Sequence, residues 1–142
     1  MKDFTTKQKG DVAEYKVVAE LLRRGFNVLM PCGDRLPYDL AIGLGERFVR
    51  VQVKLAWYSE QFNAHVVDVR RSQTNRKVYR KTKYHPEDFE FLIAWVADTN
   101  AFYVFPSQVA CSYASMITMV EGDKRQRPPK AAQYREAWVL IQ

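Results

Sequence analysis

The sequence lacks the residues on which disulfide-rich proteins and histidine-based metal sites depend. It has only two cysteines, Cys32 and Cys111, and they are too far apart for a metal-binding or redox-active motif. We therefore expect two free thiols in a reducing, intracellular compartment. The two histidines, His65 and His85, are not spaced as metal ligands with nearby acids. This argues against a nuclease that uses a histidine and one metal, so we expect both to be structural or surface residues.

The chain also lacks long apolar runs. No stretch approaches the roughly 20 apolar residues that a membrane-spanning helix requires, and residues 1–14 are polar and charged, unlike a secretory signal. There is no internal repeat or low-complexity segment. The 142 residues are 47% apolar, which suits one domain over residues 1–142 with its own core. We expect a soluble, cytoplasmic protein.

The charge balance is basic, with 22 Lys and Arg against 16 Asp and Glu, a formal net charge of +6. The excess lies mainly in residues 70–83, with seven cations and no acid, and residues 123–130, with four cations and one acid. Ordinary solvated surface loops are one interpretation. Long basic loops without counter-charges are better explained by a polyanionic partner, so we expect loops that bind double-stranded DNA and a nucleoid-associated protein.

Three residues of the first basic segment, Gln73, Asn75 and Arg76, carry planar groups that can pair with base edges. The expected DNA-binding residues are Arg70, Arg71, Gln73, Asn75, Arg76, Lys77, Arg80, Lys81, Lys83, Lys124, Arg125 and Arg127. Because these contacts would neutralise phosphates, we expect binding to weaken steeply with salt.

Hydrophobic periodicity predicts a leading helix followed by short strands. Ala13, Val17 and Leu21 recur four residues apart within a helix predicted over residues 6–24. Strict alternation of valine with polar residues predicts a strand over residues 48–56. Further strands are predicted at 26–30, 38–42, 65–70, 89–96, 102–105 and 116–120, a short helix at 106–111, and a helix or strand at 133–141. This order indicates an α+β or α/β protein with a helix on a mixed sheet.

A polar cluster interrupts the apolar pattern of two neighbouring strands. Asp39 lies near the start of one strand, and Gln52 and Lys54 lie two residues apart on the next, so the latter two side chains share a face. A short glycine-containing turn joins the strands, so Asp39 can reach that face. A carboxylate, an amide and an ammonium are costly to bury without a purpose. Binding a divalent cation and a phosphate would supply one.

Taken singly, each of these residues is an ordinary strand or turn residue. Together with Glu14 on the helix, they form the set that metal-assisted phosphodiester hydrolysis needs. Asp39 offers a hard oxygen to Mg²⁺, and the carbonyls of Val53 and Gln52 can supplement it. Lys54 can orient water or offset negative charge on the phosphate, and Glu14 can hold a second metal or its water. The expected catalytic residues are Glu14, Asp39, Gln52 and Lys54, and the expected ligands of Mg²⁺ or another divalent cation such as Mn²⁺ are Asp39, Val53, Glu14 and Gln52.

This arrangement resembles the PD-(D/E)XK nuclease superfamily, in which a helix glutamate is followed by a strand aspartate and then by (E/Q)-X-K. The matching residues are Gly10-Asp11-Val12-Ala13-Glu14, Asp39 and Gln52-Val53-Lys54. Longer segments resemble the group I intron-encoded homing endonucleases of cyanobacterial type: GDRLPYDL, VQVKLAW, VVDVRRSQTNR, FYVFP, DKRQR and YREAW. Gln52 replaces the commoner acid of the superfamily and Tyr38 separates Pro37 from Asp39. Both departures fit the intron-encoded group.

The resemblance implies an α/β fold with a restriction-endonuclease-like α/β/α core, a mixed central sheet and a leading helix. It implies Mg²⁺-dependent, sequence-specific cleavage of both strands of a long DNA target during intron homing. It also implies a homotetramer in which two subunits make the cuts. Two alternatives remain: a nuclease that resembles Holliday-junction resolvases and reads DNA shape, and a non-catalytic DNA-binding module of the same fold.

Overall fold

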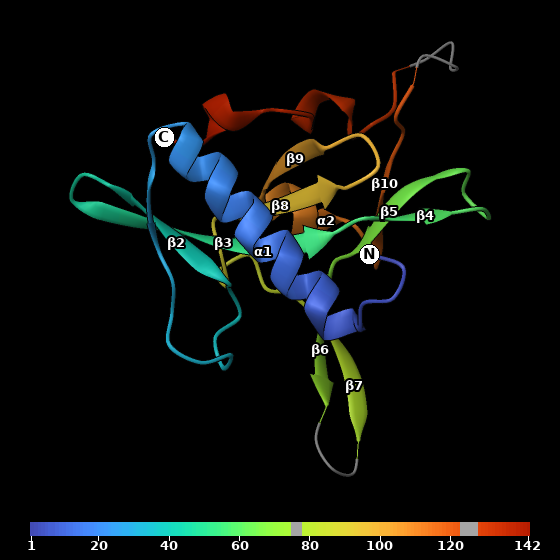
Figure 1. Cartoon of the computed structure of the whole chain (residues 1–142), viewed down its shortest axis with the longest axis horizontal. Helices are drawn as coiled ribbons and strands as arrows, with labels where there is room; N and C mark the ends of the chain where they lie inside the picture. Colours follow the sequence, from blue (N-terminus) through green and yellow to red (C-terminus); the bar gives the residue numbers. More distant parts are fainter. Residues whose placement is uncertain (75–77, 123–127) are drawn as a thin grey trace.

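The fold is taken from a computed structural model of the chain, which describes residues 1–74, 78–122 and 128–142 (Figure 1). In chain order its elements are α1 (Thr6–Arg23), β1 (Asn27–Leu29), β2 (Leu40–Leu44), β3 (Arg47–Leu55), β4 (Trp57–Ser59), β5 (Ala64–Asp68), β6 (Arg70–Thr74), β7 (Tyr79–Lys83), β8 (Phe91–Val96), β9 (Ala101–Pro106), α2 (Ser107–Ser112) and β10 (Met116–Met119). Two 3₁₀ turns follow, at Ala132–Tyr134 and Trp138–Leu140.

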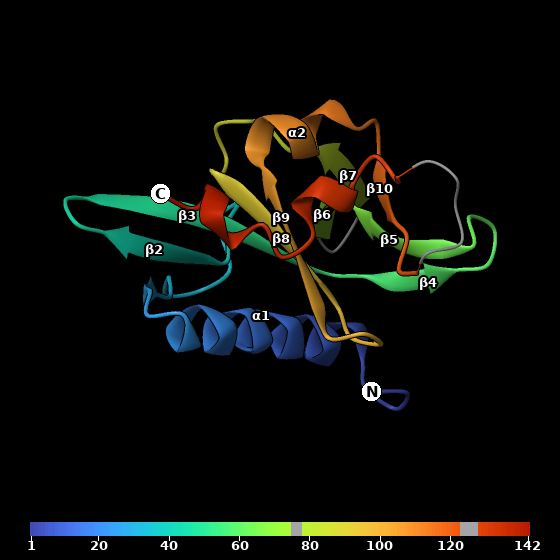
Figure 2. The ribbon, with the colours of Figure 1, turned by 90° about the horizontal axis from the view of Figure 1, so that it is seen from above.

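A five-stranded mixed sheet lies at the centre, in the order β1-β2-β3-β8-β9. Strands β3 and β8 run parallel, whereas β1-β2, β2-β3 and β8-β9 are antiparallel. Helix α1 lies against one face of this sheet and α2 lies on the opposite side (Figure 2). The expected α/β class, with a mixed sheet between helical layers, is therefore confirmed.

Helix α1 forms where the sequence predicts it and buries the predicted stripe. Thr5 and Gln8 cap each other's backbone N–H groups at its start, which is a capping box. Ala13, Val17 and Leu21 are fully buried and belong to one core cluster with the valines of β3. Because the valines of β3 face α1, the residues between them face the other side of the sheet.

A second core cluster fills that other side. It contains Leu92 and Ala94, the β8 partners of Gln52 and Lys54 in the strand register. The small sheet β10-β5-β4 contributes apolar residues such as Val67 to the same cluster. Gln52 and Lys54 therefore project into the layer between the central sheet and the β5 strand region, as the two-residue spacing predicts.

Residues 70–83, expected as a loop, contain an antiparallel two-stranded ribbon instead. Strands β6 and β7 pair from Arg70 with Lys83 to Thr74 with Tyr79, and the ribbon projects from the body of the molecule (Figure 1). The prediction was wrong because β7 is exposed along its whole length, so no buried face imposes an apolar–polar alternation. The strand expected at 65–70 likewise divides, with β5 ending at Asp68 and the ribbon beginning at Arg70.

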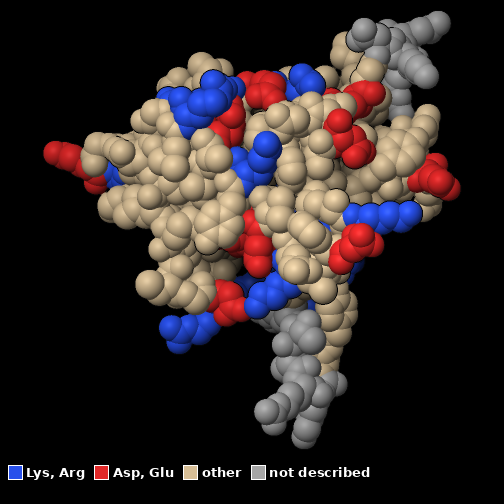
Figure 3. Space-filling model, in the orientation of Figure 1, with Lys and Arg blue, Asp and Glu red and all other residues tan. Residues whose placement is uncertain are grey.

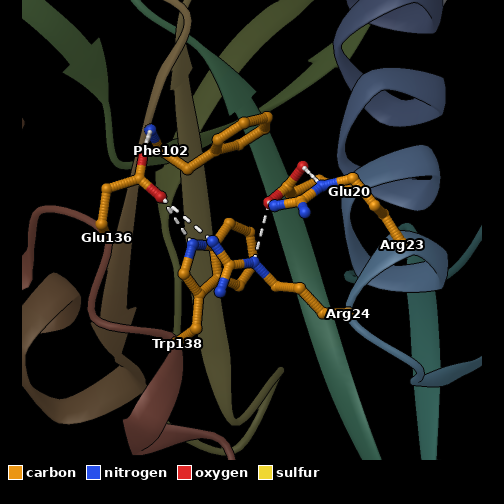
Figure 4. Close-up of polar contacts among 6 residues, drawn as sticks. All are labelled: Glu20, Arg23, Arg24, Phe102, Glu136 and Trp138. Carbon is orange, nitrogen blue, oxygen red and sulfur yellow. Dashed lines mark hydrogen bonds and ion pairs between the residues drawn. The ribbon is translucent and has the colours of Figure 1, made fainter.

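The C-terminal segment is neither the helix nor the strand expected at 133–141. Glu136 has a left-handed backbone with φ of 53°, which interrupts regular structure. Its N–H donates to the Phe102 carbonyl at 2.7 Å, and its carboxylate accepts from the Phe102 N–H at 2.8 Å and from the Trp138 indole at 2.7 Å (Figure 4). The segment thus covers β9, the edge strand of the central sheet.

Arg24 ties this segment to the end of α1. Its Nε donates to Glu20 at 2.7 Å, and its Nη2 lies 3.6 Å from Glu136 (Figure 4). The guanidinium lies over the Trp138 ring, 4.6 Å from the ring centroid. Because Trp138 also belongs to the core cluster under α1, these contacts join helix, sheet edge and C-terminal segment.

The cysteines and His65 behave as the sequence predicts. Cys32 and Cys111 are free thiols. His65 is buried and its Nε2 lies 2.7 Å from Asp98, which is a structural pair. Among the helices of the described chain, none has the length and apolar character needed to cross a membrane.

Candidate active site

Asp39, Gln52 and Val53 meet where β2 joins β3. Asp39 directly precedes β2, and its N–H donates to the carbonyl of Val51 at 2.9 Å. Its Oδ2 accepts the Val53 N–H at 2.8 Å and the Gln52 amide Nε2 at 2.7 Å. Gln52 Nε2 also donates to the Val53 carbonyl at 3.1 Å. One buried amide group therefore bridges the two oxygens that the sequence predicts as metal ligands.

This bridging places Gln52 in a different role from the one expected. Its amide N–H group donates to both oxygens, whereas a metal ligand would have to present the amide oxygen. Burial raises the pKa of Asp39, and the Val53 N–H and the charge of Lys54 oppose that rise. The amide thus supplies partial positive charge beside a half-buried carboxylate, as a cation would at the same two oxygens.

Lys54 projects from the face of β3 that points away from α1. Its Nζ donates to the Arg70 carbonyl at 3.3 Å and lies over the Tyr84 ring, 5.1 Å from the centroid. Burial lowers the pKa of Lys54, while the charges of Asp39 and Asp68 act against that lowering. The ammonium therefore stands between Asp39 and the base of the β6–β7 ribbon.

Glu14 reaches the site from α1. It lines a pocket of about 240 Å³ together with Asp11, Asp34 and Asp39. Burial raises the pKa of Glu14 to about 7, and the charges of Asp39 and Asp11 add to the rise. The charges of Asp39 and Asp11 thus disfavour the ionised form of Glu14, and a bound cation would relieve that repulsion.

The donor set fits a divalent cation. Two carboxylates, from Asp39 and Glu14, and the Val53 carbonyl are the hard oxygens that Mg²⁺ and Mn²⁺ prefer, with water completing the shell. The described residues contain no group of three or more His, Cys, Asp or Glu side chains arranged to hold a metal by themselves. A metal here would therefore depend on the backbone carbonyl and on water as well as on the two carboxylates.

Two of the expected DNA-binding cations are already paired. Arg70 and Lys81 lie 2.9 Å and 2.8 Å from Asp68. Arg71 donates to the Arg35 carbonyl at 3.0 Å. Arg80 and Lys83 are exposed on β7. The structure describes neither residues Asn75, Arg76, Lys77, Lys124, Arg125 and Arg127 nor the side chain of Gln73, so these predictions lie outside the described residues.

Sequence reasoning missed four residues of the site. Asp11 and Asp34 line the pocket of Glu14 and Asp39, and Tyr84 supports Lys54. Asp68 pairs with two cations of the ribbon. Asp11 stands in the same helix segment as Glu14, one turn earlier, and this spacing was the signal that could have identified it. For Tyr84 and Asp68, we find no signal of this kind in the sequence.

We expect Glu14→Gln to stabilise the protein when divalent cations are removed by a chelator. The folded-state pKa of about 7 exceeds the ordinary 4.5, so the unfolded state releases its proton first as the pH rises. The resulting penalty is absent below pH 4.5, grows as the pH rises and is complete above pH 7. Because Glu14 is half exposed, solvent screening reduces the expected gain at pH 8 to about 1 kcal/mol.

Urea unfolding at pH 4 and pH 8 measures this gain. Glu20→Gln on the same helix is the matched control, because bonds from Arg23 and Arg24 lower the pKa of Glu20 despite its burial, so its loss should destabilise at pH 8. An equal effect of Glu14→Gln at both pH values would contradict the raised pKa.

The chain was compared with known proteins. A sequence profile described as PD-(D/E)XK endonuclease matches residues 4–141. Among solved structures, the bacterial homing endonuclease I-Ssp6803I is similar, with 46% sequence identity, a TM-score of 0.89 and coverage of 97% of this chain and 93% of that chain. No curated protein matches the chain. The profile match includes Asp39, Gln52 and Lys54.

Proposed function

Because the chain belongs to the PD-(D/E)XK endonuclease family and is a DNA endonuclease of the homing type, we propose that it cuts both strands of a specific DNA target by Mg²⁺-dependent hydrolysis. The convergence of the Asp39 carboxylate and the Val53 carbonyl on one point, 2.7 Å and 3.1 Å from the same amide nitrogen, carries this proposal. These two oxygens, with Glu14, would hold the cation.

Asp39, Lys54 and Gln52 have separate roles in the proposed hydrolysis. When bound, a divalent cation supplies Lewis-acid stabilisation of the phosphate and lowers the pKa of its water. Asp39 is held in place by the Val53 N–H and the Gln52 amide, so its carboxylate is preorganised. Lys54 places a positive charge near Asp39 to offset charge on the phosphate. Gln52 positions Asp39. Its amide nitrogen, which bridges the Asp39 and Val53 oxygens, would be displaced when the cation binds there.

We further propose that the β6–β7 ribbon enters the major groove, which is wide enough for a two-stranded ribbon. Alternation along the paired strands places Arg71, Arg80 and Thr82 on one face of the ribbon. In Figure 3, Lys and Arg are interspersed with Asp and Glu over the visible body of the molecule, which offers no large basic patch on that face. The ribbon is therefore the better candidate for phosphate and base contacts.

We expect Arg80→Ala to weaken DNA binding and to reduce the slope of log affinity against log salt by about 1, because one phosphate contact is lost. Fluorescence anisotropy across a salt series measures both. Arg23→Ala is the control, since Arg23 is an exposed arginine on α1 that pairs with Glu20 and its loss changes the net charge equally. An unchanged slope for Arg80→Ala would place the ribbon away from DNA.

The activity itself is tested by incubating the protein with circular DNA that carries a library of candidate targets, with Mg²⁺, with Mn²⁺ or with a chelator. We expect one linear product whose sequenced ends define target and stagger, and no product with chelator. Cleavage of a four-way junction but of no duplex would instead indicate a junction-resolving nuclease. Binding without cleavage of any substrate would indicate a DNA-binding module.

Each chain carries one candidate site, so a double-strand cut by paired sites requires at least two chains. We propose the homotetramer that the resemblance implies, and light scattering of the purified protein tests it. We also propose a role in intron homing, which predicts that the gene lies within an intron and that the target is the uninterrupted insertion site.

A further inference from the structure

Asp68 lies at the junction between the body of the protein and the β6–β7 ribbon. Strand β5 ends at Asp68 and pairs with β10 up to that residue. Val69 belongs to neither β5 nor β6, and its N–H donates to the Ser115 carbonyl at 2.8 Å. The ribbon begins at Arg70. Asp68 is therefore the last strand residue anchored in the body before the proposed DNA-binding element.

The Asp68 carboxylate holds both strands of the ribbon. Oδ1 accepts the Arg70 backbone N–H at 2.9 Å and its Nε at 3.0 Å. Oδ2 accepts Arg70 Nη2 at 2.9 Å and Lys81 Nζ at 2.8 Å. Burial alone would raise the pKa of Asp68, but the bonds from Arg70 and Lys81 hold it well below its usual range. A charged carboxylate thus pairs with two ribbon cations at neutral pH and offsets one of their two positive charges.

The same Arg70 main chain reaches the active site. Its N–H and guanidinium are held by Asp68, and its carbonyl accepts from Lys54 Nζ at 3.3 Å. The same ammonium lies over the Tyr84 ring, 5.1 Å from its centroid. A continuous path of contacts therefore runs from the ribbon through Asp68 and Arg70 to Lys54.

We propose that Asp68 is a positioning residue that couples the ribbon to Lys54. It sets the Arg70 main chain that orients the Lys54 ammonium, and it withholds Arg70 and Lys81 from DNA phosphates. Cleavage therefore depends on the position of the ribbon. Part of the ribbon's affinity for DNA of any sequence is suppressed. The inference rests on the proposed function, in which the ribbon binds DNA and Lys54 acts at the phosphate.

Asp68→Asn separates this role from a purely structural one. Asn keeps the size and one acceptor oxygen but releases the charges of Arg70 and Lys81. We expect DNA affinity to rise about tenfold at low salt and the salt slope to steepen by 1 or 2. We expect the single-turnover cleavage rate at saturating protein to fall about tenfold, because Lys54 loses its orientation. A structural role would weaken both properties.

Asp98→Asn is the matched control, since it removes the same charge from the His65 pair and should change neither property. Asp68→Glu gives a second, independent reading if Asp68→Asn folds poorly. It keeps the charge but moves the carboxylate by one methylene, so DNA affinity should stay within about twofold while cleavage falls. Wild-type cleavage of Asp68→Glu would overturn the coupling.

A double-mutant cycle with Lys54→Met locates the effect. In that background Asp68→Asn should still tighten DNA binding but add no further loss of cleavage, because the ammonium it orients is absent. Additive losses would overturn the proposal.

If wild-type protein cuts DNA but Asp68→Asn matches it in binding and rate, the coupling is wrong and the proposed function stands. If wild-type protein cuts nothing, the proposed function itself fails.

Discussion

Asp39→Asn is expected to lower the single-turnover rate of DNA cleavage by at least about 10³-fold, because it removes a charged ligand from the proposed cation site. DNA binding should stay within about twofold, since Asp39 lies apart from the ribbon. The fold should survive, because the asparagine oxygen can still accept the Val53 N–H that Asp39 accepts at 2.8 Å. The variant thus separates chemistry from binding.

Two quantities are measured for the variant and the wild type. One is the single-turnover cleavage rate at saturating protein with Mg²⁺ or Mn²⁺, and the other is the cation affinity by calorimetry. Both should fall together for Asp39→Asn. Asp98→Asn is the control, because it removes a carboxylate charge outside the site, from the pair with His65, so its rate should stay within about threefold. A loss of DNA binding by Asp39→Asn would assign the carboxylate to the fold or to an interface instead.

Lys54→Met is expected to lower the cleavage rate by about 10² to 10³-fold while cation affinity is retained, because removing one electrostatic stabiliser of a reacting centre costs about that much. Methionine keeps the length of the side chain and removes the charge. Burial lowers the pKa of Lys54, so keeping the ammonium charged in the folded protein costs free energy. Methionine carries no charge, so Lys54→Met should be no less stable than the wild type. Lys54→Arg should not restore the rate, because the planar guanidinium differs in shape.

Single-turnover kinetics and thermal unfolding of Lys54→Met test this expectation. Lys16→Met is the matched control, because Lys16 also lies over an aromatic ring, that of Trp95 at 5.5 Å, but outside the site. Its cleavage rate should match the wild type. A Lys54→Met enzyme that lost cation binding as well would show that the lysine shapes the metal site rather than acting on the phosphate.

Short-range patterns made much of the fold predictable. The four-residue repeat of Ala13, Val17 and Leu21 specified α1 and its buried side, and the alternation around Val51 specified β3. In both elements burial of one face imposes the periodicity. The ribbon was missed for the same reason, since β7 has no buried face. The C-terminal segment was missed because its conformation depends on Glu136 binding the backbone of Phe102, 34 residues away.

The sequence by itself determined how two polar residues of the candidate site lie on their strand. The two-residue spacing of Gln52 and Lys54 places them on one face of a strand, and that geometry is local. Only the tertiary structure decided what they contact: Gln52 bridges the two predicted ligand oxygens as a donor, and Lys54 binds the ribbon base, 16 residues along the chain. Such contacts depend on how sheets and ribbon pack, and no local pattern of residues encodes that packing.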